Sequence, residues 1–262
     1  MRLEERTAVD LVAVKRCGDG VASTADRVVL DLTCGPGADA GLPDRMVLKT
    51  MLSSPHAPRE MFETEVRFYQ EIRPGLDVET PHAFAAAFDP ATKQFGLLFE
   101  DLSARGARFP DATQPVTPDE AAVLLAQLLA APTTLLHGDT HIANTYLLAD
   151  GTGGLLDWQL QVRGCFAHDV IYLLSTALDP DVRRREAPRF LEGYLAQLAA
   201  FGDVDAPDPD EAWEWCRRAV VWGLVIGWLI TPPENYGVEI TVAATGRMVA
   251  AVADLDGLAV LG

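Results

Sequence analysis

The stretch LLHGDTHIANTYLLADGTGGLLDWQ, residues 135–159, constrains the fold of this chain more than any other part of the sequence. Asp139 and Asn144 lie five residues apart, and Asp157 follows thirteen residues after Asn144. Between Asn144 and Asp157 the pattern predicts a short strand, a glycine turn and a second short strand. Because such a hairpin returns Asp157 to the side of Asn144, the two side chains are expected at neighbouring strand ends.

The same stretch carries the side chains that metal-assisted phosphoryl transfer needs. One carboxylate and one amide oxygen can hold Mg²⁺ together with phosphate oxygens. Asp139 is then free to orient and deprotonate a hydroxyl group. Metal-assisted hydrolysis would use similar carboxylates, but usually with more metal ligands. Taken singly, Asp139 could be a turn residue and Asn144 a left-handed residue, and it is their combined spacing that favours one shared site.

Two histidines in this stretch are assigned from weaker signals. His137 is expected to brace the loop backbone rather than to react. His141 could contact a substrate or pack in the core, and the sequence leaves both readings open.

The pattern of the chain changes near residue 101. Before this point, β-branched and leucine-rich runs predict strands, and a periodic apolar pattern predicts one helix. The expected strands are 9–14, 27–32, 46–49, 82–88 and 95–100, and the expected helix is 59–72. After it, capping residues at Thr117, Asp179 and Asp208 open helices, and the last helix covers about 240–255. The sequence therefore predicts an α+β fold of two lobes, a β-rich lobe of residues 1–101 and a mainly helical lobe of residues 102–262.

The most apolar segment, residues 219–230, is predicted to be a buried helix, because twelve residues are too few to span a membrane. Gly223 and Gly227 within it indicate close packing against another helix. Aromatic residues in and around it, in WEWCRRAVVWGLVIGWLITPPENYG, could line an apolar pocket for a steroid-like or lipid-like alcohol. A buried helix core is the more common reason for such a pattern.

The bulk composition excludes several partners. A net charge of −17 argues against nucleic acid and anionic membranes, and it permits a cationic substrate without requiring one. Four cysteines without metal-ligand spacing are expected to be reduced thiols. The N-terminal MRLEERTAVD has no apolar signal-peptide core, so a cytoplasmic protein is expected.

The first lobe carries the further residues that a kinase site requires. Kinases pair a lysine on the third strand with a glutamate from the following helix. Lys49 ends the strand in RMVLKT, and Glu65 lies sixteen residues later in ETEVRFYQEI. Glu63 is a weaker candidate, because Glu65 lies one turn before the apolar Phe68 and Tyr69 on the packed face of the helix.

Two more segments are expected at the nucleotide by their position. The turn CGDGVAST lies between the first two strands, where Gly18, Gly20 and Ser23 would cover the phosphates with backbone N–H groups and small side chains. The segment FGLLFEDL runs from the fifth strand into the joint between the lobes, where backbone groups near Glu100 and Leu102 would bind the adenine.

The motif LLHGDTHIAN, followed by LLDWQ, resembles that of the aminoglycoside phosphotransferase and choline kinase superfamily, whose members have a protein-kinase-like fold. LLFEDL, EVRFYQEI and the DWQ ending are most similar to its ecdysteroid-kinase-like branch and the bacterial relatives of that branch. The resemblance runs from about residue 9 to residue 174. The roles that it implies are a catalytic base (Asp139), magnesium ligands (Asn144, Asp157), a lysine for the α- and β-phosphates oriented by a glutamate (Lys49, Glu65) and a brace of the HGD loop (Asp169).

The resemblance implies transfer of the γ-phosphate of ATP or GTP, with Mg²⁺, to a hydroxyl group of a small molecule. A non-catalytic nucleotide-binding module on the same fold is the alternative. A protein kinase is disfavoured by the HGD motif and by the tryptophan after Asp157.

The sequence departs from the family pattern in the region that helps to build the acceptor site. Only 36 positions separate Asp101 from His137, where the family usually has further helices. Either part of the acceptor site is missing or the sequence omits a segment.

Overall fold

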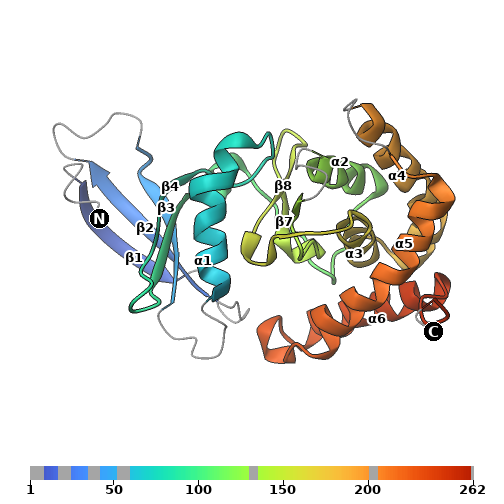
Figure 1. The fold of residues 1–262 in the computed structure, drawn as a ribbon. Coiled ribbons are helices and arrows are strands. Elements are labelled where there is room, and N and C mark those ends of the chain that lie inside the picture. The colour runs from blue at the N-terminus through green and yellow to red at the C-terminus, as the bar shows by residue number, and fades with distance from the viewer. Residues whose placement is uncertain are drawn as a thin grey trace.

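The computed structural model describes residues 9–16, 25–34, 42–51, 60–129, 135–200 and 206–260. A sheet with one covering helix lies at one end of the molecule, and a helical part with short strands lies at the other (Figure 1). This arrangement confirms the predicted α+β fold of two lobes. The boundary at residue 101 stays a prediction.

The first part is an antiparallel five-stranded sheet in the order β1-β2-β3-β5-β4. Its strands are β1 (Val9–Arg16), β2 (Asp26–Cys34), β3 (Arg45–Thr50), β4 (Ala83–Phe88) and β5 (Phe95–Glu100). Strand β3 lies between β2 and β5, with Lys49 opposite Arg27 on one side and Leu97 on the other. Lys49 therefore projects from an interior strand, where its backbone position is fixed from both sides.

Helix α1 (Glu60–Arg67) packs against this sheet and continues as the π-helical segment η2 (Phe68–Ile72) and the 3-10 turn η3 (Arg73–Gly75). Phe62 and Val66 are buried on one face of the helix, and the ring of Phe62 stacks on Phe95 of β5 with centroids 4.2 Å apart. The same face carries Glu65, which is only 1% exposed. Apolar packing thus carries a carboxylate into the interior.

The second part is built around helix α3 (Ala167–Ala177), whose residues from Asp169 onward are all buried. The other helices are α2 (Pro118–Leu129), α4 (Pro180–Ala200), α5 (Pro209–Trp222) and α6 (Val238–Asp254), with short helical segments η4 (Leu102–Arg105), η5 (Ile142–Asn144), η6 (Trp158–Leu160), η7 (Gly223–Leu229) and η8 (Pro233–Asn235). Its strands are β6 (Leu135–Leu136), β7 (Thr145–Leu147), β8 (Gly153–Leu155) and β9 (Val162–Arg163).

One hydrophobic core joins the two parts. The ring of Phe68 in η2 stacks on Trp158 in η6 with centroids 4.1 Å apart, and both side chains are almost fully buried. Tyr69 packs on Phe99 of β5 at 4.9 Å. The core therefore fixes the position of the 135–159 motif relative to the sheet.

The helix predicted at 219–230 is only partly correct. The segment is helical, as the end of α5 and the π-helical η7, and Gly223 and Trp228 are buried. Several of its large apolar side chains are exposed, however: Val225, Ile226, Leu229 and Ile230. The close packing predicted for the glycines is confirmed, since a Cβ on Gly227 would lie 2.0 Å from the hydroxyl oxygen of Tyr172 in α3. One face of the segment is thus packed and the other is not.

In the part of the chain that the structure describes, no helix combines the length and the apolar character needed to cross a membrane.

Candidate active site

Strands β7 and β8 form the hairpin that the sequence predicts. Thr145 pairs with Leu155, and the backbone N–H of Leu156 donates to the carbonyl oxygen of Asn144 at 2.8 Å. Asn144 and Asp157 therefore lie at the same open end of the hairpin. Asp157 adopts the left-handed region with a φ of 59°, a conformation that short polar residues tolerate better than most.

Asn144 is tied to Asp139 through its amide nitrogen. This nitrogen donates to the backbone oxygen of Asp139 at 2.8 Å and to its Oδ2 at 3.0 Å. With Nδ2 occupied by these bonds, the amide oxygen of Asn144 is available as an oxygen ligand. The orientation matches what a hard cation would require from this residue.

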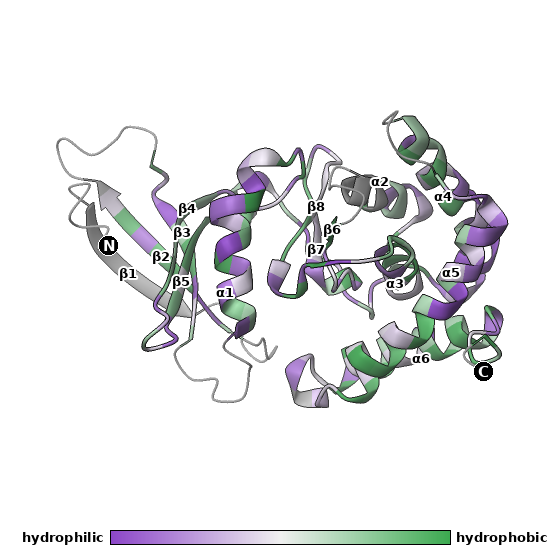
Figure 2. Ribbon diagram, viewed as in Figure 1, coloured by the Kyte–Doolittle hydropathy of each residue, from purple (hydrophilic) through white to green (hydrophobic). Residues whose placement is uncertain are grey.

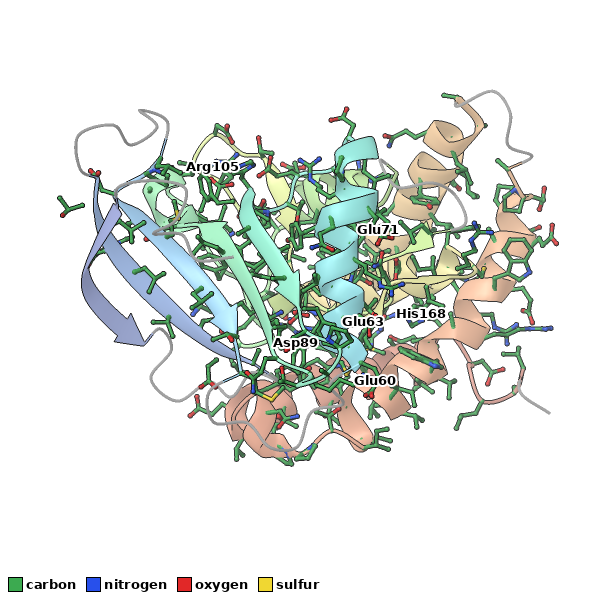
Figure 3. The ribbon with its side chains drawn as sticks, turned by 60° about the vertical axis from the view of Figure 1, so that its left-hand side comes forward. Glu60, Glu63, Glu71, Asp89, Arg105 and His168 are labelled. Carbon is green, nitrogen blue, oxygen red and sulfur yellow. The ribbon has the colours of Figure 1, made fainter. Side chains whose placement is uncertain are left out.

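A second cluster at the open end of the hairpin consists of Lys49, Glu65 and Asp157. The Nζ of Lys49 donates to both carboxylate oxygens of Glu65, at 2.9 and 2.7 Å, and lies 3.3 Å from Oδ2 of Asp157. Glu63, which lies on the same helix (Figure 3), pairs instead with Arg67 at 2.8 Å on the surface. The structure thus brings together the lysine and the glutamate preferred from the sequence.

Burial dominates the electrostatics of Glu65. It raises the pKa of this carboxyl group, an effect that the ammonium group of Lys49 opposes and that Asp157 reinforces. Gln159 donates to Oε2 of Glu65 at 3.3 Å, which also favours the charged form. Within the buried Lys49–Glu65 pair, each residue therefore has a second partner, Asp157 for Lys49 and Gln159 for Glu65.

Asp169 at the start of α3 holds the HGD loop. Its two carboxylate oxygens accept hydrogen bonds from the backbone N–H groups of His137 at 2.7 Å and Gly138 at 3.0 Å. Gly138 has a φ of 83°, and a Cβ there would lie 2.1 Å from the carbonyl oxygen of Leu160, so only glycine fits. Burial raises the pKa of Asp169 to about 7, although both N–H bonds oppose this shift.

The side chain of His137 also holds the HGD loop in place. Its Nε2 lies 2.6 Å from the carbonyl oxygen of Leu156, and its Nδ1 accepts from the backbone N–H of Asp139 at 3.2 Å. The carbonyl requires the proton on Nε2, so the two contacts define one neutral tautomer. Burial lowers the pKa of His137, in agreement with a neutral ring.

His141 connects Asp139 to the C-terminal helices. Its Nε2 lies 3.6 Å from Oδ2 of Asp139 and 3.5 Å from the hydroxyl oxygen of Tyr236. The ring is buried among Tyr172, Trp228 and Tyr236, with centroids 6.0, 5.5 and 5.4 Å away. Burial alone would raise the pKa of Asp139, but His141 and further donors outweigh this and lower it, so the carboxyl group is ionised near neutral pH.

The remaining predicted positions divide into two groups. Gly18, Gly20 and Ser23 lie outside the described residues. Glu100 lies at the end of β5, where its Oε1 accepts from the backbone N–H of His82 at 2.8 Å, and Leu102 is buried at the start of η4. Their backbone groups lie between the two parts of the molecule, where the sequence placed the adenine.

Three contributors to the site were not found from the sequence. Gln159 supports Glu65, His168 has its Nε2 3.2 Å from the carbonyl oxygen of Gly138, and Tyr236 reaches His141. Gln159 lies two positions after Asp157, and His168 immediately precedes Asp169. This proximity to predicted site residues was the signal by which the sequence could have pointed to them. Tyr236 lies 95 residues after His141, and no spacing rule connects them.

The fold and the assembled side chains define a kinase-like phosphotransferase. The family model described as the phosphotransferase enzyme family, APH, matches residues 82–215, just over half of the chain. The chain belongs to this family, and the predicted phosphotransferase is confirmed by this membership. No curated protein matches the sequence.

Solved structures share the fold at low sequence identity. The GDP and kanamycin complex of APH(2")-IIia is 11% identical, with a TM-score of 0.52 and coverage of 94% of both chains. A GDP complex of a mutant aminoglycoside 2'-phosphotransferase-IIIa is also 11% identical, with a TM-score of 0.50 and coverage of 94% of this chain and 92% of the other. At such identity the likeness establishes the fold.

Proposed function

We propose that this phosphotransferase moves the γ-phosphate of ATP or GTP to a hydroxyl group of a small molecule, with Mg²⁺. The observation that carries the proposal is the convergence of Lys49, Asp139, Asn144 and Asp157 from β3, the HGD loop and the two strand termini at the open end of the β7–β8 hairpin. The GDP in both structural neighbours supports nucleotide use by this fold. A non-catalytic binding module would not need an ionised Asp139 at this position.

The described residues fit a magnesium ion that is shared with the nucleotide. Asn144 presents an amide oxygen and Asp157 a carboxylate, while the structure contains, within its described residues, no cluster of three or more His, Cys, Asp or Glu able to hold a metal alone. A two-ligand site of this kind relies on phosphate oxygens for the rest of its coordination. When bound, the ion neutralises charge on the transferred phosphate.

The residues of the chain then have separate tasks. Lys49 binds phosphate oxygens and is held in place by Glu65. Asp139 accepts a hydrogen bond from the acceptor hydroxyl and receives its proton as the acceptor oxygen bonds to the γ-phosphorus. The bond between the γ-phosphorus and the bridging oxygen breaks at the same time, and the nucleoside diphosphate leaves. Catalysis is mainly positioning and charge stabilisation.

The Asp139→Asn variant tests the proposal. We expect phosphoryl transfer to fall by about 10³-fold or more, because the variant cannot take the proton, while thermal stabilisation by MgATP is retained. Acceptor phosphorylation is measured by mass spectrometry with a library of hydroxyl compounds. Asp150→Asn, an exposed change in the β7–β8 turn, is the matched control and should keep full activity. Equal turnover in the Asp139 variant would exclude this role.

A further inference from the structure

The imidazole ring of His141 is enclosed, yet one of its nitrogens is left without a partner. The side chain is 1% exposed, and its neighbours are the aromatic rings of Tyr172, Trp228 and Tyr236. Within the described residues, no group forms a hydrogen bond with the buried Nδ1. A buried polar atom without a partner lowers stability. If packing were the only task of this position, an apolar side chain of similar size would therefore serve better.

The polar contacts of His141 are all made by its other nitrogen, Nε2. This atom lies 3.6 Å from Oδ2 of Asp139 and 3.5 Å from the hydroxyl oxygen of Tyr236. A carboxylate can only accept hydrogen bonds, so Nε2 is the donor in its contact with Asp139. Hydrogen bonds at catalytic sites are often long before the substrate binds, and they shorten in the reacting complex. The ring is thus directed at the proposed catalytic base.

The two carboxylate oxygens of Asp139 have different surroundings. Oδ2 accepts a hydrogen bond from Nδ2 of Asn144 at 3.0 Å and is also the oxygen nearest to His141. No side chain or backbone group of the described segments donates to Oδ1, and the Asp139 side chain is partly exposed. Oδ1 is therefore the oxygen that is left for the hydroxyl group of an acceptor.

Both groups that face Oδ2 are carried by one short turn. His141 directly precedes the 3-10 segment η5, and Asn144 is its last residue. The backbone N–H of Asn144 donates to the carbonyl oxygen of His141 at 2.8 Å and closes the turn. The turn thereby places an amide and an imidazole beside the same carboxylate oxygen.

Tyr236 connects this turn to a distant part of the chain. It follows η8, and its ring lies 5.0 Å from that of Trp228 and 5.4 Å from that of His141, between centroids. Figure 2 shows η7 and α6, which precede and follow Tyr236 in the chain, largely in the colour of apolar residues. The hydroxyl group of Tyr236 thus gives His141 a polar contact from a largely apolar stretch.

We propose that His141 is a positioning residue for Asp139. Together with Asn144 it holds Oδ2, so that Oδ1 meets the acceptor hydroxyl and takes its proton, while Tyr236 fixes the imidazole ring. This inference rests on the proposed function and adds the residues that orient its base. Because the attacking and leaving oxygens are roughly in line in phosphoryl transfer, Asp139 and His141 lie on the acceptor side of the γ-phosphate and Lys49 on the nucleotide side.

Two variants of similar side-chain volume test the role of His141. Gln keeps an N–H donor at this position, and Met does not. Water serves as the acceptor, since Asp139 should orient it as it orients an alcohol, and release of phosphate from MgATP is measured with the full chain. We expect His141→Met to lower kcat at least about tenfold at an unchanged KM for MgATP, because a misplaced base affects the chemical step. His141→Gln should keep kcat within about threefold of the wild type.

Thermal unfolding separates positioning from packing. His141→Met removes the buried Nδ1 that lacks a partner, so its melting temperature should not be lower than that of the wild type. Equal kcat values in the Met and Gln variants overturn the inference. A kcat that falls in both variants together with the melting temperature also overturns it, since this is the result of a structural role alone.

A matched pair of tyrosine variants tests the part of Tyr236. The rings of Tyr172 and Tyr236 both contact His141, but the hydroxyl group of Tyr172 forms no hydrogen bond within the described segments. We expect Tyr236→Phe to lower kcat by about three- to tenfold and Tyr172→Phe to leave it unchanged. Equal kcat values in these two variants overturn the assignment of Tyr236.

Crystal structures with MgADP decide the orientation of Asp139 without reference to turnover. We expect Oδ2 to point to Nε2 of His141 in the wild type and to the same position in His141→Gln, and the carboxylate to be rotated in His141→Met. An unchanged carboxylate in His141→Met overturns the inference and leaves the proposed function intact. A wild type that MgATP does not stabilise, and that releases no phosphate from it, contradicts the proposed function itself.

Discussion

The two sides of the candidate active site are held in place by different forces. On the nucleotide side, Lys49 and Glu65 form a buried ion pair, with Nζ within 2.9 Å of both carboxylate oxygens. On the acceptor side, Asp139 is held by a neutral amide and lies near His141, which is packed among aromatic rings. Charge therefore organises one side, and packing organises the other.

This difference agrees with what each side is proposed to bind. A triphosphate with Mg²⁺ carries concentrated charge, and a buried lysine stabilises that charge strongly because little water competes with it. An acceptor hydroxyl is neutral, and in the proposed role Asp139 has to be ionised and correctly oriented rather than neutralised. The lowered pKa of Asp139 agrees with this requirement. Removal of the Lys49 cation should therefore act mainly on the use of the nucleotide.

The largest effect in this comparison is expected from Lys49→Met. The change removes a phosphate contact and leaves Glu65 buried without its cation, so kcat/KM for MgATP should fall by about 10²–10³-fold and the free energy of unfolding by about 3–5 kcal/mol. The double variant Lys49→Met/Glu65→Leu should recover most of the stability but none of the activity. Denaturant unfolding and steady-state kinetics measure both quantities.

Arg67→Ala serves as a control for Lys49→Met. Arg67 is exposed, and the change also removes a cation that pairs with a glutamate of helix α1, Glu63. It should change both quantities little, because exposed ion pairs contribute about 1 kcal/mol or less. If activity returned in the double variant, the phosphate contact would lie elsewhere.

A smaller effect is expected from Asp169, which braces the acceptor-side loop. Its pKa is raised to about 7, so the native protein keeps a proton that the unfolded chain releases near its ordinary pKa of about 4. The contribution of this group to stability is therefore complete below about pH 4 and is lost as the pH rises through about 7. Relative to Asp169→Asn, the unfolding free energy of the wild type should fall between pH 4.5 and 7.5 in urea titrations. A constant difference across this range would contradict the raised pKa.

The smallest effect is expected from a glycine in the packed face of η7. Gly227→Ala places a Cβ against the hydroxyl group of Tyr172 and should lower the unfolding free energy by about 1–3 kcal/mol. Gly246→Ala in α6 meets no atom within 4 Å and should raise it by about 0.5–1 kcal/mol. Thermal unfolding of both variants measures the contrast. Equal shifts would mean that η7 is not held against α3.

Local sequence predicted the nucleotide side in detail. Lys49 and Glu65 were paired from a strand, a helix and a separation of sixteen positions, and the structure places them in contact. The prediction of this contact succeeded because the alternation of side chains along a strand and the periodicity of a helix indicate which side chains face inward. Their functional roles stay predictions.

The acceptor side was predicted less well. The segment 219–230 was expected to be a buried helix, because its composition is apolar, but its outer face is exposed. Hydrophobicity shows which residues prefer to leave water, but burial also requires an element that covers them. The contact between His141 and Tyr236 depends on how α3, η7 and α6 pack, and local patterns do not encode this packing.

The sequence by itself determined the β7–β8 hairpin, the two-lobe α+β class and the family, because these depend on short spacings of polar residues between apolar runs. Only the tertiary structure decided that Asn144 turns its amide nitrogen to Asp139, that Asp169 holds the HGD loop through two backbone N–H groups, and that Tyr236 reaches His141. These features join residues that are far apart in the chain or depend on the orientation of a single side chain. The packed core, rather than local propensity, determines both.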